Sequence, residues 1–204
     1  MNKSILTKLG NKIELIDGKG KTLIIGVFHG DEPQGKYLID EYLKTNSEEG
    51  LLFIPCLNPD GLQLGKRTNA NGVDLNRNFP AKNWELTEKN EFFGGMSAGS
   101  ETETQFLIDT INEFKPELIL TLHAPYKVVN YDGPAKEISE KISQIINYPV
   151  EESIGYPTPG SFGTYAGIER QIPTITLELD EVCPVQDLVK PIFQIFDMLK
   201  KRGL

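Results

Sequence analysis

The sequence predicts an α/β sandwich, in which a central sheet lies between layers of helices. Two observations predict it. Short runs of β-branched and aliphatic residues alternate along the chain with segments of helical periodicity, which is the pattern of strands connected by helices. The length of 204 residues fits one domain, so residues 1–204 are expected to share a single core.

Each predicted element rests on its own residue pattern. Strands are predicted at residues 21–28, 51–57, 118–122 and 172–179, where apolar and β-branched side chains are concentrated. Helices are predicted at residues 33–45, 100–114, 134–147 and 184–201, the first two from apolar side chains at helical spacing. Pro33 suits the start of the first helix, and Ser100 with Glu103 has the pattern of a capping box at the second.

The segments between these elements are predicted to be turns and loops. The run Asn58-Pro59-Asp60-Gly61 has strong turn chemistry and is expected to end the second strand. Residues 62–99 are rich in Gly, Asn and Lys, and residues 156–167 are rich in Gly and Pro. A loop as long as the first is usually functional or disordered when it occurs inside a compact domain.

The charge balance excludes some partners. The chain has 21 basic and 29 acidic side chains, a net charge of −8, so we expect no nucleic-acid and no membrane partner. No stretch is long and apolar enough to span a membrane, and residues 1–8 lack the apolar core of a secretory signal. Cys56 and Cys183 form no close-spaced motif. We therefore expect a cytoplasmic protein with two free thiols.

The two histidines of the chain, His29 and His123, both follow hydrophobic runs at the ends of predicted strands. Sites in open α/β sheets collect at the carboxyl ends of strands, which favours a common site. Glu32 follows His29 on the same turn, and two histidines with one glutamate are an established ligand set for catalytic zinc. A solvated loop and a semi-buried histidine are the plainer alternatives.

Glu178 is an acid within the last predicted strand. Because side chains alternate across a sheet, Thr176 and Glu178 face one side and Leu177 the other. A carboxylate there is costly unless it is paired or functional, and beside zinc it can move a proton from water to a leaving amine. The alternative is a carboxylate that emerges at the rim of the sheet.

Two arginines in the long loop are further candidates. Arg77 offers a planar fork that suits a carboxylate, and the neighbouring Asn76 can add a donor. Arg67 can face a developing oxyanion. The alternative for each arginine is a surface charge.

One pattern competes with the zinc interpretation. The run Gly95-Met96-Ser97-Ala98-Gly99 matches the G-x-S-x-G elbow of serine hydrolases, which needs a strand before it and a helix after it. A helix is predicted after it, but residues 90–94 make a poor strand. A serine hydrolase would also leave His29, Glu32 and Arg77 without a role.

Five segments together resemble the zinc carboxypeptidase family. In the family's order they are His29-Gly30-Asp31-Glu32, Asn58-Pro59-Asp60-Gly61, Asp74-Leu75-Asn76-Arg77-Asn78-Phe79, Leu122-His123 and Thr176-Leu177-Glu178-Leu179. Within the family, the segments at 100–104, 123–125, 131–134 and 155–167 are similar to those of bacterial murein peptide amidases. The resemblance implies a single-domain three-layer α/β/α sandwich with a mixed central sheet.

The resemblance also implies the metal centre. His29, Glu32 and His123 would bind one zinc ion, and Asp74 would orient His29 from behind.

The same resemblance implies how the substrate is held and cleaved. Glu178 would act as general base and then as general acid, and Arg67 would stabilise the oxyanion. Asn76 and Arg77 would hold the terminal carboxylate of the substrate, and Tyr156 would cap the substrate.

The implied reaction is hydrolysis of the γ-D-glutamyl–meso-diaminopimelate amide of a murein tripeptide, which releases diaminopimelate for cell-wall recycling. The partner is then a small murein peptide, and loops shorter than the family's leave either an open cleft or a homodimer that walls it. Rival functions are a carboxypeptidase of other specificity, a zinc deacylase of the aspartoacylase or succinylglutamate desuccinylase type, and a non-catalytic module that binds peptidoglycan peptides. Glu178 beside a metal favours an enzyme over a binding module. No residue could be assigned from the sequence to the distal ammonium of diaminopimelate.

Overall fold

The computed structural model describes residues 3–152 and 155–201. Within this part of the chain, eight strands form one sheet in the order β1-β2-β4-β3-β5-β8-β6-β7. The strands are β1 Lys3–Leu6, β2 Lys12–Asp17, β3 Thr22–Gly26, β4 Leu51–Ile54, β5 Leu118–His123, β6 Val128–Asp132, β7 Val150–Glu151 and β8 Thr174–Glu178. Strands β4, β3, β5 and β8 are parallel neighbours, whereas β2 and β6 run antiparallel to β4 and β8. The prediction of a mixed central sheet is confirmed.

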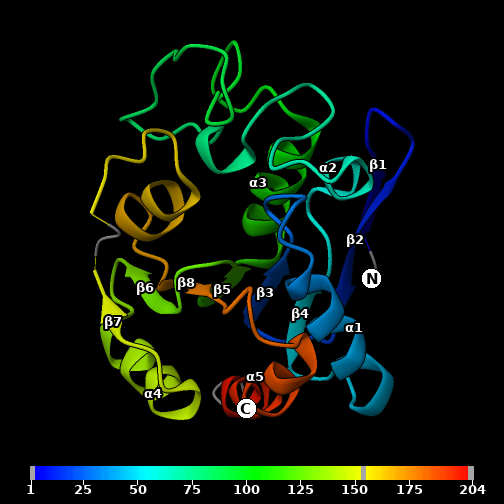
Figure 1. Ribbon diagram of the computed structural model, residues 1–204, viewed down its shortest axis with the longest axis vertical. Helices are drawn as coiled ribbons and strands as arrows, with labels where there is room; N and C mark the ends of the chain where they lie inside the picture. The colour runs from blue at the N-terminus through cyan, green and yellow to red at the C-terminus, as the bar shows by residue number, and fades with distance from the viewer. Residues whose placement is uncertain (1–2, 153–154, 202–204) are drawn as a thin grey trace.

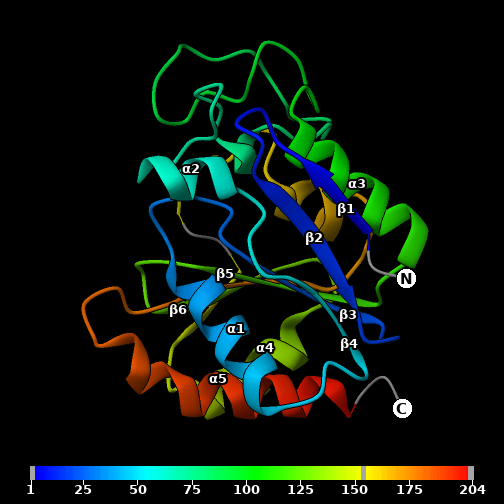
Figure 2. The same cartoon turned by 90° about the vertical axis from the view of Figure 1, so that its right-hand side faces the viewer.

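Helices cover both faces of this sheet. They are α1 Gln34–Thr45, α2 Pro59–Leu64, α3 Thr102–Phe114, α4 Lys136–Ile146 and α5 Val185–Lys200, with a 3₁₀ helix η1 Leu75–Arg77 and a π-helix η2 Gly163–Ile168. Helices α1, α4 and α5 lie on one face, and α3 and η2 lie on the other (Figures 1 and 2). Leu120 and Leu177 pack toward the first group and Ile119 toward the second, so the buried strands are apolar on both sides. The three-layer prediction is confirmed.

Helix α2 lies where the sequence predicts a turn. Asn58 Oδ1 accepts a hydrogen bond from the Gly61 N–H at 2.9 Å, Pro59 occupies the first turn, and Gly65 ends the helix with φ of 61°. The turn prediction was wrong because an Asn-Pro pair that ends a strand also begins a helix.

The predicted capping box at Ser100 is wrong as well. Helix α3 begins at Thr102, and Ser100 Oγ donates to Glu101 Oε1 at 2.6 Å instead of capping the helix. Glu103 is buried, and its Oε2 accepts a hydrogen bond from Asn69 Nδ2 at 3.3 Å. Glu103, which would complete a capping box, therefore binds Asn69 of the long loop instead.

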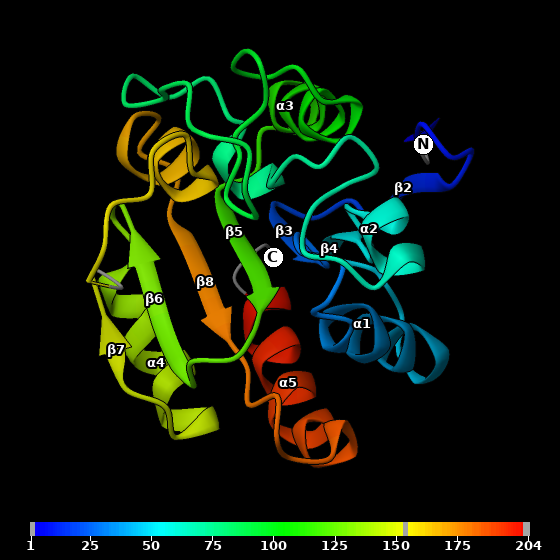
Figure 3. The same cartoon turned by 45° about the horizontal axis from the view of Figure 1, so that its top comes forward.

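The sheet register brings three segment ends to one edge. Gly26 at the end of β3 pairs with Leu122 of β5, and His123 at the end of β5 pairs with Glu178 at the end of β8. Figure 3 shows β5, β8 and β6 side by side beneath the long loop. The carboxyl ends of parallel strands thus form the place where side chains of distant segments meet.

Candidate metal centre and active site

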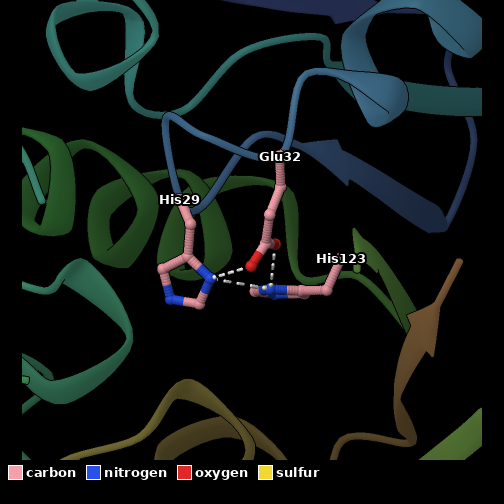
Figure 4. Close-up of side chains that lie close together, drawn as sticks. All are labelled: His29, Glu32 and His123. Carbon is pink, nitrogen blue, oxygen red and sulfur yellow. Dashed lines mark hydrogen bonds and ion pairs between the residues drawn. The ribbon is translucent and has the colours of Figure 1, made fainter. Parts of the chain in front are cut away.

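Three side chains converge where β3 and β5 end (Figure 4). His29 and Glu32 lie in the loop after β3, and His123 is the last residue of β5. Nδ1 of His29 and Nδ1 of His123 are 3.3 Å apart, and the Glu32 carboxylate oxygens lie 2.7 Å and 3.0 Å from these nitrogens. The structure brings together the three residues that the sequence suggested as metal ligands.

The spacing of these atoms suits zinc. Zinc takes imidazole nitrogen and carboxylate oxygen in tetrahedral sites with bonds of about 2.0–2.1 Å, so two ligand atoms are separated by roughly 3.3 Å. The separation of the two imidazole Nδ1 atoms, 3.3 Å, matches this value. All three side chains are buried, which keeps the donor atoms in one arrangement.

The electrostatics of the cluster favour a positive charge. Burial alone would raise the pKa of Glu32, but the neighbouring His29 and His123 lower it to about 2. Burial would lower the pKa of His29, but Asp74 and Glu32 outweigh this and raise it to about 9. A cluster that stabilises both the carboxylate and a cation between its ligands is suited to hold a metal ion.

The loop that carries His29 is fixed by close backbone packing. A Cβ on Gly30 would lie 2.0 Å from the backbone carbon of Gly61, so only glycine fits against α2 at this position. Asn58 Nδ2 donates to the backbone carbonyls of Phe28 and Arg67, each at 3.2 Å. One asparagine therefore ties the histidine loop to the loop of Arg67.

Asp74 lies fully buried behind the metal-binding cluster. Its Oδ1 is 3.2 Å from His29 Nε2 and accepts the Asn76 N–H at 2.8 Å. Its Oδ2 accepts from Nε and Nη2 of Arg67 at 3.0 Å and 2.9 Å. Burial would raise the pKa of Asp74, but His29 and the arginines hold it well below its usual range. One carboxylate thus orients both an imidazole and a guanidinium.

A cavity of about 570 Å³ opens beside the cluster. Its lining includes the three cluster residues together with Arg67, Asn76, Arg77, Tyr156 and Glu178. Every site residue expected from the sequence therefore faces this cavity, except Asp74 behind His29.

Glu178 presents a carboxylate to the cavity from the end of β8. The residue is 7 % exposed, and its Oε2 has no hydrogen-bond partner among the residues that the structure describes. Burial raises the pKa of this carboxyl group, although His123 opposes the shift. A buried polar atom without a partner is costly, so this carboxylate is not the rim acid that the sequence also allowed.

Asn76 and Arg77 form another part of the wall. Arg77 is buried, and its Nη1 donates to the carbonyl of Asn76 at 2.7 Å. Asn76 Oδ1 accepts the Phe162 N–H at 2.9 Å, so the amide nitrogen of that side chain is the group left to bind a ligand. Burial lowers the pKa of Arg77, but an arginine stays protonated. Tyr156 is exposed and interacts with the Arg77 guanidinium.

Several residues of the cavity received no role from the sequence. They include Tyr126, Asn130, Asp132, Glu152 and Thr176. The signal that could have found two of them is the alternation in β6, where Asn130 and Asp132 alternate with the core residues Val129 and Tyr131. A five-residue strand that begins soon after His123 is too short to stand out by periodicity.

Comparison with known proteins identifies the family. The model of the zinc carboxypeptidase family matches residues 7–155. The chain belongs to the zinc carboxypeptidase family. Murein peptide amidase A of Escherichia coli K12 is 34% identical to this zinc carboxypeptidase over 192 residues, which are 87% of this chain and 78% of that protein. Murein peptide amidase A of Vibrio campbellii is 34% identical over 184 residues, 82% of this chain and 72% of that protein.

Solved structures agree with this membership. The crystal structure of the murein-tripeptide amidase MpaA from Escherichia coli O157 superposes on this zinc carboxypeptidase with a TM-score of 0.87 and 30% identity, over 98% of this chain and 91% of that chain. Carboxypeptidase A from Helicoverpa armigera gives a TM-score of 0.77 at 18% identity, over 100% of this chain and 68% of that chain, and shows the shared fold alone.

The G-x-S-x-G run of this zinc carboxypeptidase has none of the geometry of a serine elbow. Ser97 is exposed in a loop, and residues 55–117, all of them described, contain no strand. The Ser97 carbonyl accepts a hydrogen bond from Asn78 Nδ2 at 3.2 Å, which is a structural role.

Proposed function

We propose that this zinc carboxypeptidase hydrolyses the γ-D-glutamyl–meso-diaminopimelate amide of a murein tripeptide and releases diaminopimelate, with residues 1–204 as one catalytic domain. The observation that carries the proposal is the unpartnered Glu178 Oε2 in the same cavity as a His-Glu-His cluster. Relatives called murein peptide amidase, which align with most of the chain, support the choice of substrate.

The metal would be held by His29 Nδ1, the Glu32 carboxylate and His123 Nδ1, as one zinc ion. When bound, zinc supplies Lewis acidity, which acidifies a water molecule and polarises the scissile carbonyl. Asp74 keeps the Nε2 side of His29 occupied, so that Nδ1 points to the metal position.

Glu178 moves the proton in this proposal. Its carboxylate accepts a proton from the attacking water and donates it to the nitrogen of the leaving diaminopimelate. Burial raises the pKa of this carboxyl group, which makes it a stronger base than a solvated glutamate. Arg67 Nη1 lies 3.9 Å from Glu32 Oε1, so its charge is close to the metal ligands and can stabilise the developing oxyanion.

Asn76 and Arg77 would bind the terminal carboxylate of the peptide. The buried guanidinium of Arg77 offers a fork for two hydrogen bonds, and the amide of Asn76 adds a donor. Tyr156, at the open side of the cavity, would cover the bound residue.

The acyl part of the peptide has room in an adjacent hollow of about 460 Å³. Both hollows share the lining residues Asp31, Arg67 and Glu91, and the second adds Lys66 and Lys89. These lysines supply positive charge near the free carboxylate of the γ-glutamyl residue, although the whole chain has a net charge of −8.

We also propose that the reaction takes place in the cytoplasm and serves the recycling of cell-wall peptides. The partner would be a small murein peptide, without nucleic acid or membrane. In residues 3–152 and 155–201, no helix is both long and apolar enough to cross a bilayer. A homodimer stays a prediction, which sedimentation equilibrium of the purified chain tests.

Competition between substrates tests the proposal. Zinc-loaded protein is given L-alanyl-γ-D-glutamyl-meso-diaminopimelate, N-acetylaspartate, N-succinylglutamate and an ordinary α-linked tripeptide, and kcat/KM is measured for each. The murein tripeptide is expected to be cleaved fastest. Faster hydrolysis of either acyl amino acid would assign the chain to the deacylases instead.

A further inference from the structure

The cavity continues along strands β8 and β6, away from the metal cluster. These strands are antiparallel neighbours, and Figure 3 shows them side by side. Val128 pairs with Glu178, Asn130 pairs with Thr176, and Asp132 lies farther along the same face of β6. Side chains of paired residues point to the same side of a sheet, so Asn130, Thr176 and Asp132 line one wall that begins at Glu178.

The carboxyl group of Asp132 is half-buried in this wall without a counter-ion. Within residues 3–152 and 155–201, no hydrogen bond or ion pair reaches it, and burial is the only cause that raises its pKa, to about 6. Glu152, which follows β7, and Glu181, which follows β8, also line the cavity, and both are acids. The basic groups of the cavity, Arg67 and Arg77, lie near Asp74 instead. This end of the cavity therefore favours a cation from the substrate.

Two glycines next to Asp132 leave the space that its side chain occupies. A Cβ on Gly163 would lie 2.1 Å from Asp132 Oδ2, and a Cβ on Gly167 would lie 2.4 Å from Asp132 Cβ. Both glycines belong to η2, which packs directly on β6. Any larger residue at either position would displace the acid, so the wall is built around it.

We propose that Asp132 binds the distal ammonium of the diaminopimelate residue and thereby selects this residue for release. The proposal rests on the proposed function, because it takes the tripeptide as substrate. Asp132 is a specificity-determining residue, whereas the chemistry stays with Glu178 at the other end of the wall.

The dimensions of the substrate agree with this assignment. Asp132 is four residues along β6 from the partner of Glu178, so the two backbone positions are separated by roughly 13 Å at about 3.3 Å per residue. The scissile nitrogen of diaminopimelate and its distal ammonium are joined by six bonds, which span about 7 Å at roughly 1.2 Å per bond. A hydrogen bond of about 3 Å at each end brings the total to about 13 Å.

A matched pair of peptides tests the proposal. L-alanyl-γ-D-glutamyl-meso-diaminopimelate is compared with the same peptide that ends in 2-aminopimelate, which keeps the distal carboxylate and lacks only the distal ammonium. Zinc-loaded wild-type protein is expected to cleave the first with kcat/KM roughly 10–100-fold higher, as for the loss of one charge-assisted hydrogen bond. The Asp132→Asn variant is expected to bring this ratio close to one, and the exposed Asp109→Asn substitution on α3 should leave it unchanged.

The ratio of the two peptides does not depend on the fraction of variant that folds, so it stays informative for a destabilised variant. Equal cleavage of both peptides by the wild type, or an undiminished preference in Asp132→Asn, would overturn the role of Asp132 and leave the proposed function standing. Cleavage of neither peptide by zinc-loaded wild type would overturn the proposed function and the role of Asp132 with it.

Discussion

Glutamate and glutamine side chains have nearly the same shape, but only the carboxylate of glutamate readily accepts a proton, so glutamine at position 178 separates the two properties. The Glu178→Gln variant is therefore expected to keep its zinc and to lose roughly 10²–10⁴-fold in kcat, because the substitution removes the base and no metal ligand. Metal analysis of the dialysed variant and steady-state kinetics check both parts. Wild-type turnover in the variant would exclude Glu178 as the base.

Asp74 supports two groups of the site at once, so its neutral isostere is informative. The Asp74→Asn variant keeps the volume but removes the negative charge between His29 and Arg67. We expect zinc affinity to fall roughly 10–100-fold, measured by competition with a chromogenic chelator. Unchanged affinity would show that the buried carboxylate serves Arg67 alone.

The sequence could predict those site residues that lie at the ends of strands with a clear apolar pattern. His29, His123 and Glu178 each follow or end an apolar run, so their meeting at one edge follows from parallel strand order. Asp132 gave no such signal, since β6 returns antiparallel after only a short connection and its polar residues face a cavity. The residue that we propose for the distal ammonium could therefore be found only from the sheet register, which is a tertiary property.

Among the elements, helix α2 is held by a single side chain that also joins two loops of the site. Asn58 caps the Gly61 N–H and donates to the carbonyls of Phe28 and Arg67. The Asn58→Ala variant is expected to lose about 1–3 kcal/mol of unfolding free energy, measured in urea, because a cap and two buried acceptors are left without their partner.

A control for that measurement is Thr45→Ala at the exposed end of α1. The Thr45 hydroxyl donates to the Glu41 carbonyl and accepts from Asn46 Nδ2, both at the surface, so its loss should change the unfolding free energy by no more than about 0.5 kcal/mol. Equal effects of the two substitutions would mean that Asn58 does not tie the loops together.

The long elements were predictable and the short ones were not. Helices α1, α3, α4 and α5 show apolar periodicity, and the four parallel strands of the core are short runs of apolar and β-branched residues; both signals lie in the local sequence. Strand β7 has two residues, and the hairpin β1–β2 lies at an edge, so tertiary pairing rather than local pattern determines them. The segment between α2 and α3, which the sequence predicted as loop, is held by asparagine side chains; for example, Asn69 Nδ2 donates to Glu101 Oε2 at 2.8 Å.

For the whole molecule, zinc binding is expected to stabilise the folded state. A ligand present at about 1,000 times its Kd adds about 4 kcal/mol, which is roughly 8–16 °C in Tm for a chain of this size. Chelation should lower the Tm of the wild type by this amount and leave the Tm of a His123→Ala variant unchanged. An equal Tm of the wild type with and without chelator would speak against the metal centre.

The most direct test of the account is mass spectrometry of the products from L-alanyl-γ-D-glutamyl-meso-diaminopimelate. The account predicts free diaminopimelate and the dipeptide L-alanyl-γ-D-glutamate, no release after chelation, and recovery when zinc is added back. An intact peptide in the presence of zinc-loaded protein, or release that survives chelation, would contradict the account.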